Sequence, residues 1–241
     1  MKGRILIGGD GRKFYVSDTE KDFHTQYGFI KKKDLKKKNS IVKTNIGTEF
    51  LIFEPYFIDV YKKLKRHAQI IMLKDIGIIV AETGINRESI VVDAGSGSGA
   101  LALFLANIAK KVYTFDVDDR AIKVVRENIK LLDLKNVVLK KIDVYREIPV
   151  KNADVIILDL KEPWEAVKNA GKSLKLGGFL VLYTPQVTQV IEVLKCFGSD
   201  FLHLKTVELI ERDWEFRDKI ARPKNIEIGH TGFLTFARRI R

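Results

Sequence analysis

The chain has 241 residues, of which 46% are hydrophobic and 31% are charged, with a formal net charge of +12. This composition excludes a disordered chain and allows one α/β core with a small accessory domain. No apolar run reaches the roughly 18 residues that a membrane span requires, and the start of the chain lacks an apolar signal core, so we expect a cytoplasmic protein without a membrane partner.

Residues 1–65 have the pattern of a small all-β domain. Short β-type runs, such as Ile5–Ile7 and Glu49–Phe53, are separated by glycine-rich and asparagine-rich turns. The segment Lys31–Lys38 holds six lysines in eight positions. A solvated loop is the plain interpretation of this charge run, and contact with RNA phosphates is the functional one.

A connecting segment follows at residues 55–84. A helix could open at Pro55–Tyr61 with proline in its first turn. A second helix is predicted at Lys74–Glu82, ending near Gly84.

The stretch Ile90–Ala106 predicts a buried strand, a glycine turn and an apolar helix. Asp93 ends the strand, and Gly95, Gly97 and Gly99 allow a tight turn with close backbone approach. Free amides at the start of the following helix suit the polar parts of a nucleotide-like ligand. An ordinary strand-to-helix turn is the alternative.

From residue 90 onward, strands and helices alternate, which predicts a doubly wound, mostly parallel sheet. The expected elements are strands at Val112–Phe115, Val137–Ile142, Asp154–Leu158 and Phe179–Tyr183, and helices at Asp119–Leu132, Pro163–Leu174 and Val187–Cys196. The last two strands, Phe201–Glu211 and His230–Ala237, have no crossover helix between them and should pair antiparallel at a sheet edge. The connection Arg212–Gly229 is mixed and charged.

Four aspartates, Asp93, Asp116, Asp143 and Asp159, each follow an apolar strand. The carboxyl ends of parallel strands share one rim, where ligands bind, so we expect these acids to lie along one crevice. Asp116 ends the second strand, where an acid accepts hydrogen bonds from ribose hydroxyls. An aspartate after a strand is also a common helix N-cap, which is the structural alternative for each of them.

The spacing of Gly95, Gly97 and Ala100 also matches a dinucleotide-binding pattern, so an NAD-dependent oxidoreductase is a second candidate. Asp93 would repel a pyrophosphate, and an antiparallel strand pair is unlike an all-parallel dinucleotide sheet. A cationic cofactor without phosphate, S-adenosylmethionine, fits an acidic rim better.

The segment Asp93–Gly99 resembles the first motif of class I methyltransferases. The segments Asp159–Ala166, Thr184–Pro185 and Gly229–Ala237 resemble, more narrowly, the tRNA adenine-N1 methyltransferases that modify a T-loop adenine. The resemblance covers most of the chain, including the segment Arg66–Ile71 and Lys74–Asp75. It implies that residues 66–241 form a Rossmann-like methyltransferase domain, beside the β-rich domain 1–65.

The resemblance also implies roles for particular residues. The cofactor would be bordered by Asp93, the loop residues Gly95, Ser96, Gly97, Ser98 and Gly99, and by Gln69, Asp116, Asp143 and Asp159. Asp159 would lie between methyl donor and target base, and the enzyme would be a homotetramer whose tRNA site is shared between subunits. Two departures touch the substrate side: Met72 stands where the family usually has an aromatic residue, and Lys161 where it often has a small or apolar one.

Adenine N1 is a neutral nucleophile, so methyl transfer moves positive charge onto the base. A carboxylate beside the exocyclic amine would stabilise that cation, and we predict that Asp159 does so. His230 is a candidate substrate contact, with a hydrogen bond in a turn as its structural alternative. His24, His67 and His203 lack ligand spacing, so we expect no metal, and the lone Cys196 excludes a disulfide and should be buried.

Two other classes of function stay open. A non-catalytic RNA-binding subunit would share the fold but would not need the glycine loop. A methyltransferase acting on another RNA, a protein or a small molecule would share the whole cofactor site, because the fold does not fix the substrate.

Overall fold

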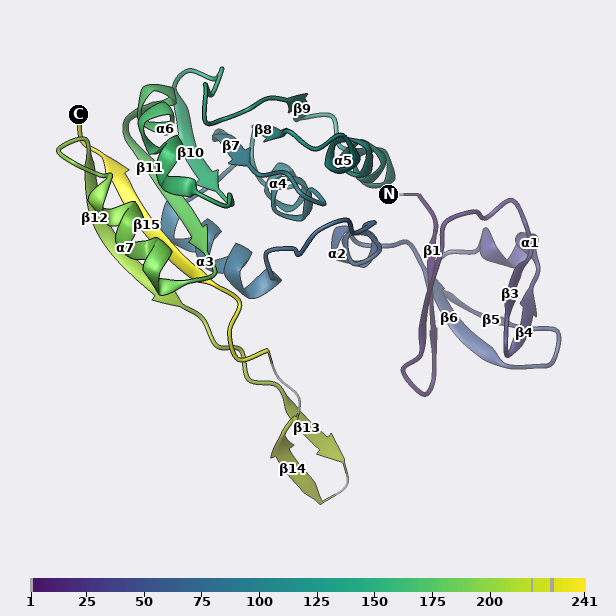
Figure 1. Ribbon diagram of the computed structural model, residues 1–241. Helices are drawn as coiled ribbons and strands as arrows, with labels where there is room; N and C mark the ends of the chain where they lie inside the picture. The colour runs from purple at the N-terminus through teal and green to yellow at the C-terminus, as the bar shows by residue number, and fades with distance from the viewer. Residues whose placement is uncertain (1, 218, 226–227) are drawn as a thin grey trace. The chain divides into compact units, whose positions relative to one another are not determined.

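The computed structural model describes residues 2–217, 219–225 and 228–241. Met1, in the predicted β-rich domain, and Asp218, Ile226 and Glu227, in the predicted connection, lie outside the described residues. The chain forms two compact units, Met1–Leu64 with Leu131–Asp133, and Lys65–Lys130 with Leu134–Arg241. Figure 1 traces both units.

The N-terminal unit is β-rich, as the turn-separated runs predicted. An antiparallel sheet has the order β2-β1-β6-β5, and a hairpin pairs β3 with β4. Its elements are β1 (Arg4–Gly8), β2 (Lys13–Val16), β3 (Phe23–Thr25), β4 (Gly28–Ile30), α1 (Lys32–Leu35), β5 (Ser40–Lys43), β6 (Glu49–Phe53) and α2 (Phe57–Tyr61). Alternate residues of the strands, such as Leu6, Phe50 and Ile52, fill one apolar core.

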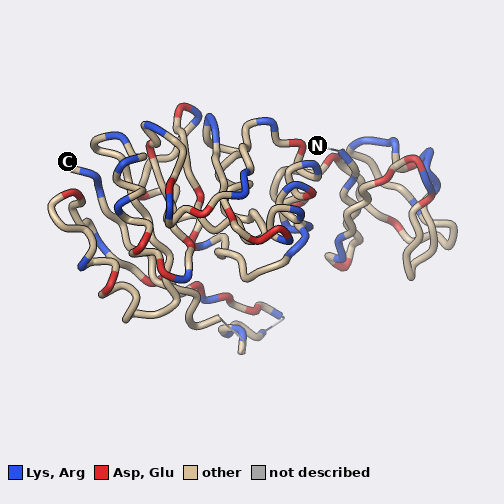
Figure 2. The backbone as a smooth tube through the Cα atoms, turned by 45° about the horizontal axis from the view of Figure 1, so that its top comes forward, with Lys and Arg blue, Asp and Glu red and all other residues tan. Residues whose placement is uncertain are grey.

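The lysine run of this unit is not a plain solvated loop. Leu35 is fully buried in the core, which anchors the short helix α1. Three of the lysines are paired with acids: Lys36 with Glu20, Lys37 with Asp34 and Lys38 with Glu54. Figure 2 shows basic and acidic residues distributed over both units.

The second unit contains the predicted mostly parallel sheet, with strand order β12-β15-β11-β10-β7-β8-β9. Strand β15 runs antiparallel to both neighbours, which confirms the antiparallel edge pair. The strands are β7 (Ile90–Ala94), β8 (Lys111–Asp116), β9 (Val137–Lys141), β10 (Ala153–Leu158), β11 (Leu174–Thr184), β12 (Phe201–Glu208) and β15 (Phe233–Arg239).

Among the described residues, one α-helix precedes these strands, and four others lie between them in the chain. They are α3 (Leu73–Thr83), α4 (Ala100–Ala106), α5 (Asp119–Leu132), α6 (Val167–Ser173) and α7 (Val187–Lys195). Gly84 ends α3 with a left-handed backbone, φ 66°, as its position predicted. Because the strands are buried on both faces, near-continuous apolar runs such as residues 155–158 form the core.

The predicted helix Pro163–Leu174 is wrong in its type and its end. Proline opens a 3₁₀ turn, Pro163–Ala166, and the α-helix covers only Val167–Ser173. Leu174 already pairs with Ala153 as the first residue of β11. The register then shifts, and Gly177 and Gly178 lie in this irregular part of the strand.

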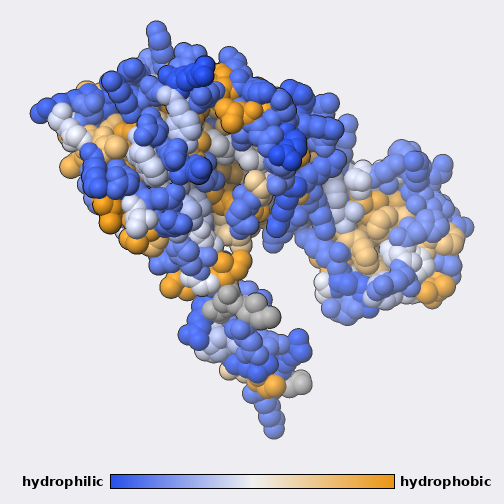
Figure 3. Space-filling model, viewed as in Figure 1, coloured by the Kyte–Doolittle hydropathy of each residue, from blue (hydrophilic) through white to orange (hydrophobic). Residues whose placement is uncertain are grey.

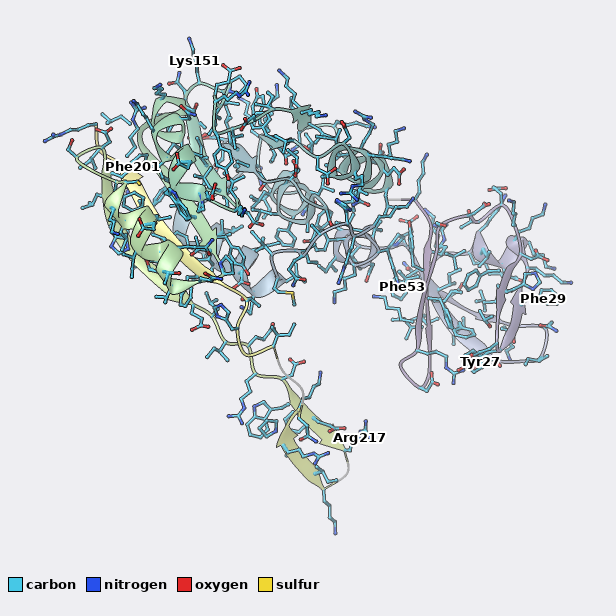
Figure 4. All side chains as sticks on the ribbon, viewed as in Figure 1. Tyr27, Phe29, Phe53, Lys151, Phe201 and Arg217 are labelled. Atoms are coloured by element: carbon cyan, nitrogen blue, oxygen red, sulfur yellow. The ribbon has the colours of Figure 1, made fainter. Side chains whose placement is uncertain are left out.

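Three further expectations at the C-terminal end are corrected. The connection Arg212–Gly229 contains a hairpin of β13 (Trp214–Arg217) and β14 (Ile220–Pro223), because its apolar residues alternate with charged ones. Arg217 lies on this hairpin (Figure 4), and Figure 3 shows apolar atoms among hydrophilic ones where the chain approaches it.

The last strand begins at Phe233, later than predicted, and Cys196 is exposed. Within the described residues, no helix is long and apolar enough to cross a membrane.

Candidate functional site

The glycine turn follows β7 and is held against two neighbouring strands. The amides of Gly95 and Ser96 both donate to the carbonyl of Phe115 at 3.0 Å. Gly95 has φ +96°, and a Cβ there would lie 1.9 Å from the carbonyl oxygen of Asp159. Only glycine allows this backbone approach, which brings the ends of β7 and β10 together.

Asp93 lies at the bottom of the site and is only 1% exposed. Its Oδ2 accepts a hydrogen bond of 2.7 Å from the hydroxyl of Thr114, which lies 2.7 Å from the hydroxyl of Ser96. Its Oδ1 is buried and has no hydrogen-bond partner among the described residues. Burial raises the pKa of Asp93 to about 8, and the charges of Asp159 and Asp116 act in the same direction.

Asp159 is the first residue after β10. Its amide donates to the carbonyl of Ala94 at 2.9 Å, which continues the pairing of β10 with β7. Burial of the carboxyl group raises the pKa of Asp159 to about 7, with a further contribution from the charge of Asp116. Two carboxyl groups in this site therefore titrate near neutral pH, where a cationic ligand would draw both into the charged form.

Asp116 is connected to the same turn through the backbone. Its Oδ2 accepts a hydrogen bond of 2.9 Å from the amide of Gly97, and its Oδ1 accepts from the amides of Val117 and Asp118. Asp143 follows β9, where its Oδ1 accepts from the amide of Tyr145 and its Oδ2 pairs with Arg146 at 3.3 Å. Such local hydrogen bonds are expected for an aspartate that caps a helix or a turn. They are equally compatible with an aspartate that binds a ligand.

The segment before α3 is fastened to the glycine turn by Ser98. The Ser98 hydroxyl accepts from the amides of His67 at 2.8 Å and Ala68 at 3.2 Å. As a result, Gln69 borders a small pocket with most of the turn. The pocket is lined by Gln69, Ile70, Ile71, Asp93, Gly95, Ser96, Gly97, Ser98, Ala100, Leu101 and Asp159.

Six of the expected site residues are outside this lining: Gly99, Asp116, Asp143, Met72, Lys161 and His230. Gly99 is the N-cap of α4, with φ 79°. Met72 follows Ile71 and is the N-cap of α3. Lys161 is exposed, and its carbonyl accepts from the Gln189 side chain at 3.0 Å.

Both ring nitrogens of His230 have partners. Nδ1 lies 2.5 Å from Glu208 Oε1, and Nε2 lies 2.7 Å from the carbonyl oxygen of Pro185. Because both partners are acceptors, the doubly protonated ring is favoured, and the bond to Glu208 raises the pKa of His230. This arrangement fastens the segment before β15 to the end of β12 and to the loop after β11.

Sequence reasoning missed Thr114 and four residues of the pocket lining, Ile70, Ile71, Ala100 and Leu101. A threonine inside an otherwise apolar strand beside Asp93 is a signal that could have identified Thr114. Ile70 and Ile71 carry no signal of their own, since their place depends on the Ser98 hydrogen bonds. Among the described residues, no group of three or more His, Cys, Asp or Glu side chains could hold a metal ion.

Comparison with known proteins gives one consistent family. Residues 60–222 match the family described as the tRNA methyltransferase complex GCD14 subunit. The chain is 35% identical to the tRNA (adenine(57)-N(1)/adenine(58)-N(1))-methyltransferase TrmI of Methanocaldococcus jannaschii, over 98% of this chain and 94% of the relative.

Two solved structures cover the whole chain. One is the tRNA (m1A58) methyltransferase TrmI of Aquifex aeolicus, with a TM-score of 0.83, 26% identity and 97% of that chain covered. The other, described as a SAM-dependent O-methyltransferase of Thermotoga maritima, has a TM-score of 0.88, 26% identity and 93% coverage. Both share the two-part architecture of this chain over its full length.

Proposed function

The chain belongs to the tRNA methyltransferase family of the GCD14 subunit, and from this membership we infer that it is an S-adenosylmethionine-dependent tRNA (adenine-N1)-methyltransferase. Its acceptor is N1 of an adenine in the T-loop, and its methyl donor is S-adenosylmethionine. The expectation from the sequence resemblance is thus confirmed for the family, the reaction and the cofactor.

The observation that carries the proposal for the site is the pair of buried acids beside the glycine turn. A methyl donor with a sulfonium and an α-ammonium group is cationic. Asp93 has a buried Oδ1 without a partner among the described residues, and burial raises the pKa values of both Asp93 and Asp159. A partly desolvated pocket that holds two acids and, among the described residues that line it, no basic side chain suits such a cation and disfavours a pyrophosphate.

The residues proposed to hold the donor are those the pocket brings together, with Asp116 beside them. Gly95, Ser96 and Gly97 supply close backbone approach, and Gln69 lines the same pocket. Asp116 would accept hydrogen bonds from the ribose, and Asp143 would meet the adenine edge. When bound, the donor supplies an activated methyl group.

Asp159 is the proposed catalytic residue. It lines the pocket, and within the described residues no hydrogen bond or ion pair engages its carboxylate. As positive charge develops on the target adenine, this carboxylate beside the exocyclic amine stabilises it, and the pocket holds donor and acceptor in line. No strong base is needed before attack, because N1 already has a free lone pair.

The residues proposed to contact the tRNA lie outside the lining of the pocket. Met72, directly after the pocket residue Ile71, would cover the target base with a polarisable side chain. Lys161 is an exposed cation suited to a phosphate, and we also keep His230 as a proposed contact at the rim. The base must leave the folded loop to be methylated, and the basic chain supplies affinity for the surrounding backbone.

For the assembly, we propose a homotetramer in which neighbouring subunits share the tRNA site. We propose division of the chain into a β-rich, RNA-contacting domain (1–65) and a Rossmann-like domain (66–241). Since the substrate is tRNA, the proposed place of action is the cytoplasm.

The test is transfer of a labelled methyl group to bulk tRNA, followed by digestion to nucleosides. We expect the label in 1-methyladenosine. The variant Asp159→Ala should retain affinity for the donor within a few fold while turnover falls by about two orders of magnitude or more. Leu160→Ala, at the next position along the chain, serves as the control. Unchanged turnover in Asp159→Ala would remove this residue from the mechanism.

A second candidate is methyl transfer to an oxygen of another substrate, since one full-length structural relative is described as an O-methyltransferase. The same assay separates the two. Label in a small molecule or protein and none in tRNA would favour that candidate.

A further inference from the structure

A buried ion pair lies at the start of α3, outside the residues assigned above. Lys74 and Asp75 have side chains that are only 9% and 0% exposed, and Lys74 Nζ lies 2.8 Å from Asp75 Oδ1. Burying charges is costly unless both are paired and fully hydrogen-bonded. A lysine in such a place has no freedom to contact a phosphate.

The ammonium group of Lys74 has an acceptor for each of its three hydrogens. Besides Asp75, Nζ donates to the carbonyl of Leu209 at 2.8 Å and to the hydroxyl of Thr231 at 2.6 Å. The Thr231 hydroxyl in turn donates to Asp75 Oδ2 at 3.0 Å. The three side chains form a closed, fully satisfied ring, which is the condition under which a buried polar network makes a structure rigid.

The two acceptors beyond the ion pair flank the hairpin segment. Leu209 directly follows β12, and Thr231 precedes β15 by two residues. Between them lie residues 210–230, with the hairpin β13–β14. Lys74 therefore connects both ends of the segment 210–230 to α3.

Thr231 extends the network toward the site. Its carbonyl accepts a hydrogen bond of 2.6 Å from the hydroxyl of Tyr183. In the parallel pairing of β10 with β11, Leu158 lies opposite Leu182. The next residues along the two strands are Asp159 and Tyr183, which are therefore level with each other. A Cβ at Gly232 would lie 2.6 Å from the Tyr183 ring, so the ring is held tightly as well.

Tyr183 is buried, and its hydroxyl feels the charges of two acids. Burial raises the pKa of Tyr183 to about 12, and the charges of Asp75 and Asp159 add to this effect. The hydroxyl consequently remains a neutral group whose proton is committed to Thr231.

We propose that Lys74 is a positioning residue for methyl transfer: through Leu209 and Thr231 it fixes the two ends of the 210–230 segment, and through Thr231 it holds Tyr183, which lies level with Asp159 on the neighbouring strand. This proposal rests on the proposed function of the same site. It assigns Lys74 to the interior network and not to tRNA binding.

The primary test is Thr231→Val, which keeps the shape and leaves the Lys74–Asp75 pair intact. We expect turnover on tRNA to fall by about tenfold or more, because small misplacements at a reacting centre are costly. Donor affinity should stay within about twofold, since Lys74, Asp75 and Thr231 do not line the donor pocket. Thr231→Ser, which restores the hydroxyl, should recover turnover.

Lys74→Met is the second variant, paired with a matched control. Lys205→Met removes another lysine that pairs with α3, but its partner Glu82 is 33% exposed and Lys205 itself 39%. This control should change turnover less than about twofold, as exposed pairs contribute little.

A readout that does not need activity is the rate of tryptic cleavage at the basic residues of segment 210–230. Lys74→Met and Thr231→Val should both speed this cleavage several-fold, and Lys205→Met should not. If the unaltered protein methylates no tRNA, the proposed function fails, while the cleavage rates still test the clamp. Unchanged turnover in Thr231→Val, failure of Thr231→Ser to recover it, or unchanged cleavage in both variants would overturn the proposal.

Discussion

Replacing Gly95 by alanine tests how the site is assembled. The new Cβ would lie 1.9 Å from the Asp159 carbonyl oxygen, and real Cβ atoms essentially never come within 3.0 Å of such an atom, so the two loops must separate by about 1 Å. The left-handed backbone, φ +96°, adds about 1–2 kcal/mol for any residue other than glycine. We expect the melting temperature to fall and methyl transfer to drop by about 100-fold, because Asp159 moves with its backbone.

Gly97→Ala is the matched control in the same turn. Gly97 also has a positive φ, +50°, but the nearest atom to a new Cβ is the Ala68 Cβ at 3.7 Å, so only the backbone cost applies. Its melting temperature should fall by about 2–4 °C for each kcal/mol lost. The assay is thermal unfolding of the unliganded proteins. A decrease in Gly95→Ala no larger than that in Gly97→Ala would refute the reasoning.

Three other predictions concern the titrating groups. Because the pKa of Asp93 is raised to about 8, the folded state retains a proton that the unfolded state releases. The stability of the unliganded protein therefore falls as pH rises from about 4 to about 8. Over that range, the melting temperature of Asp93→Asn should rise relative to that of the unaltered protein. Affinity for the cationic donor should increase as pH rises through about 8, since the buried Asp93 must lose its proton to pair with the cation, and calorimetry should show this increase reduced in Asp93→Asn. Because the pKa of His230 is raised, its bond to Glu208 stabilises the protein below that pKa, and this stabilisation is lost as pH rises through the pKa. Tryptic cleavage of segment 210–230 should therefore accelerate at high pH, and His230→Gln should abolish this pH dependence.

Local patterns predicted much of the second unit. The helices at Ala100–Ala106 and Asp119–Leu132 have the predicted bounds, because a periodic apolar face and the turn residues beside it act over short distances. The acids at the carboxyl ends of β7, β8 and β10 were found for the same reason, although β7 continues for one residue beyond Asp93: an apolar run that leads to an aspartate is visible in the chain. The family resemblance rested on these segments and was confirmed.

Local patterns failed where a distant partner decides the conformation. Leu174 reads as the end of a helix, but pairing with Ala153 of β10 makes it the first residue of β11. The segment Arg212–Gly229 reads as a connection, yet cross-strand pairing folds it into a hairpin. Cys196 follows an apolar helix pattern, and only its place at the end of α7 leaves it exposed.

The sequence by itself determined the alternation of strands and helices, the glycine turn and the acids at the strand ends, since each depends on neighbours in the chain. Tertiary structure alone decided that Gly95 meets the Asp159 backbone and that Thr114 binds Asp93. It also brought Lys74 to Leu209 and Thr231, more than 100 positions away. Such contacts depend on strand order and register, which fix distances between residues that no local pattern relates.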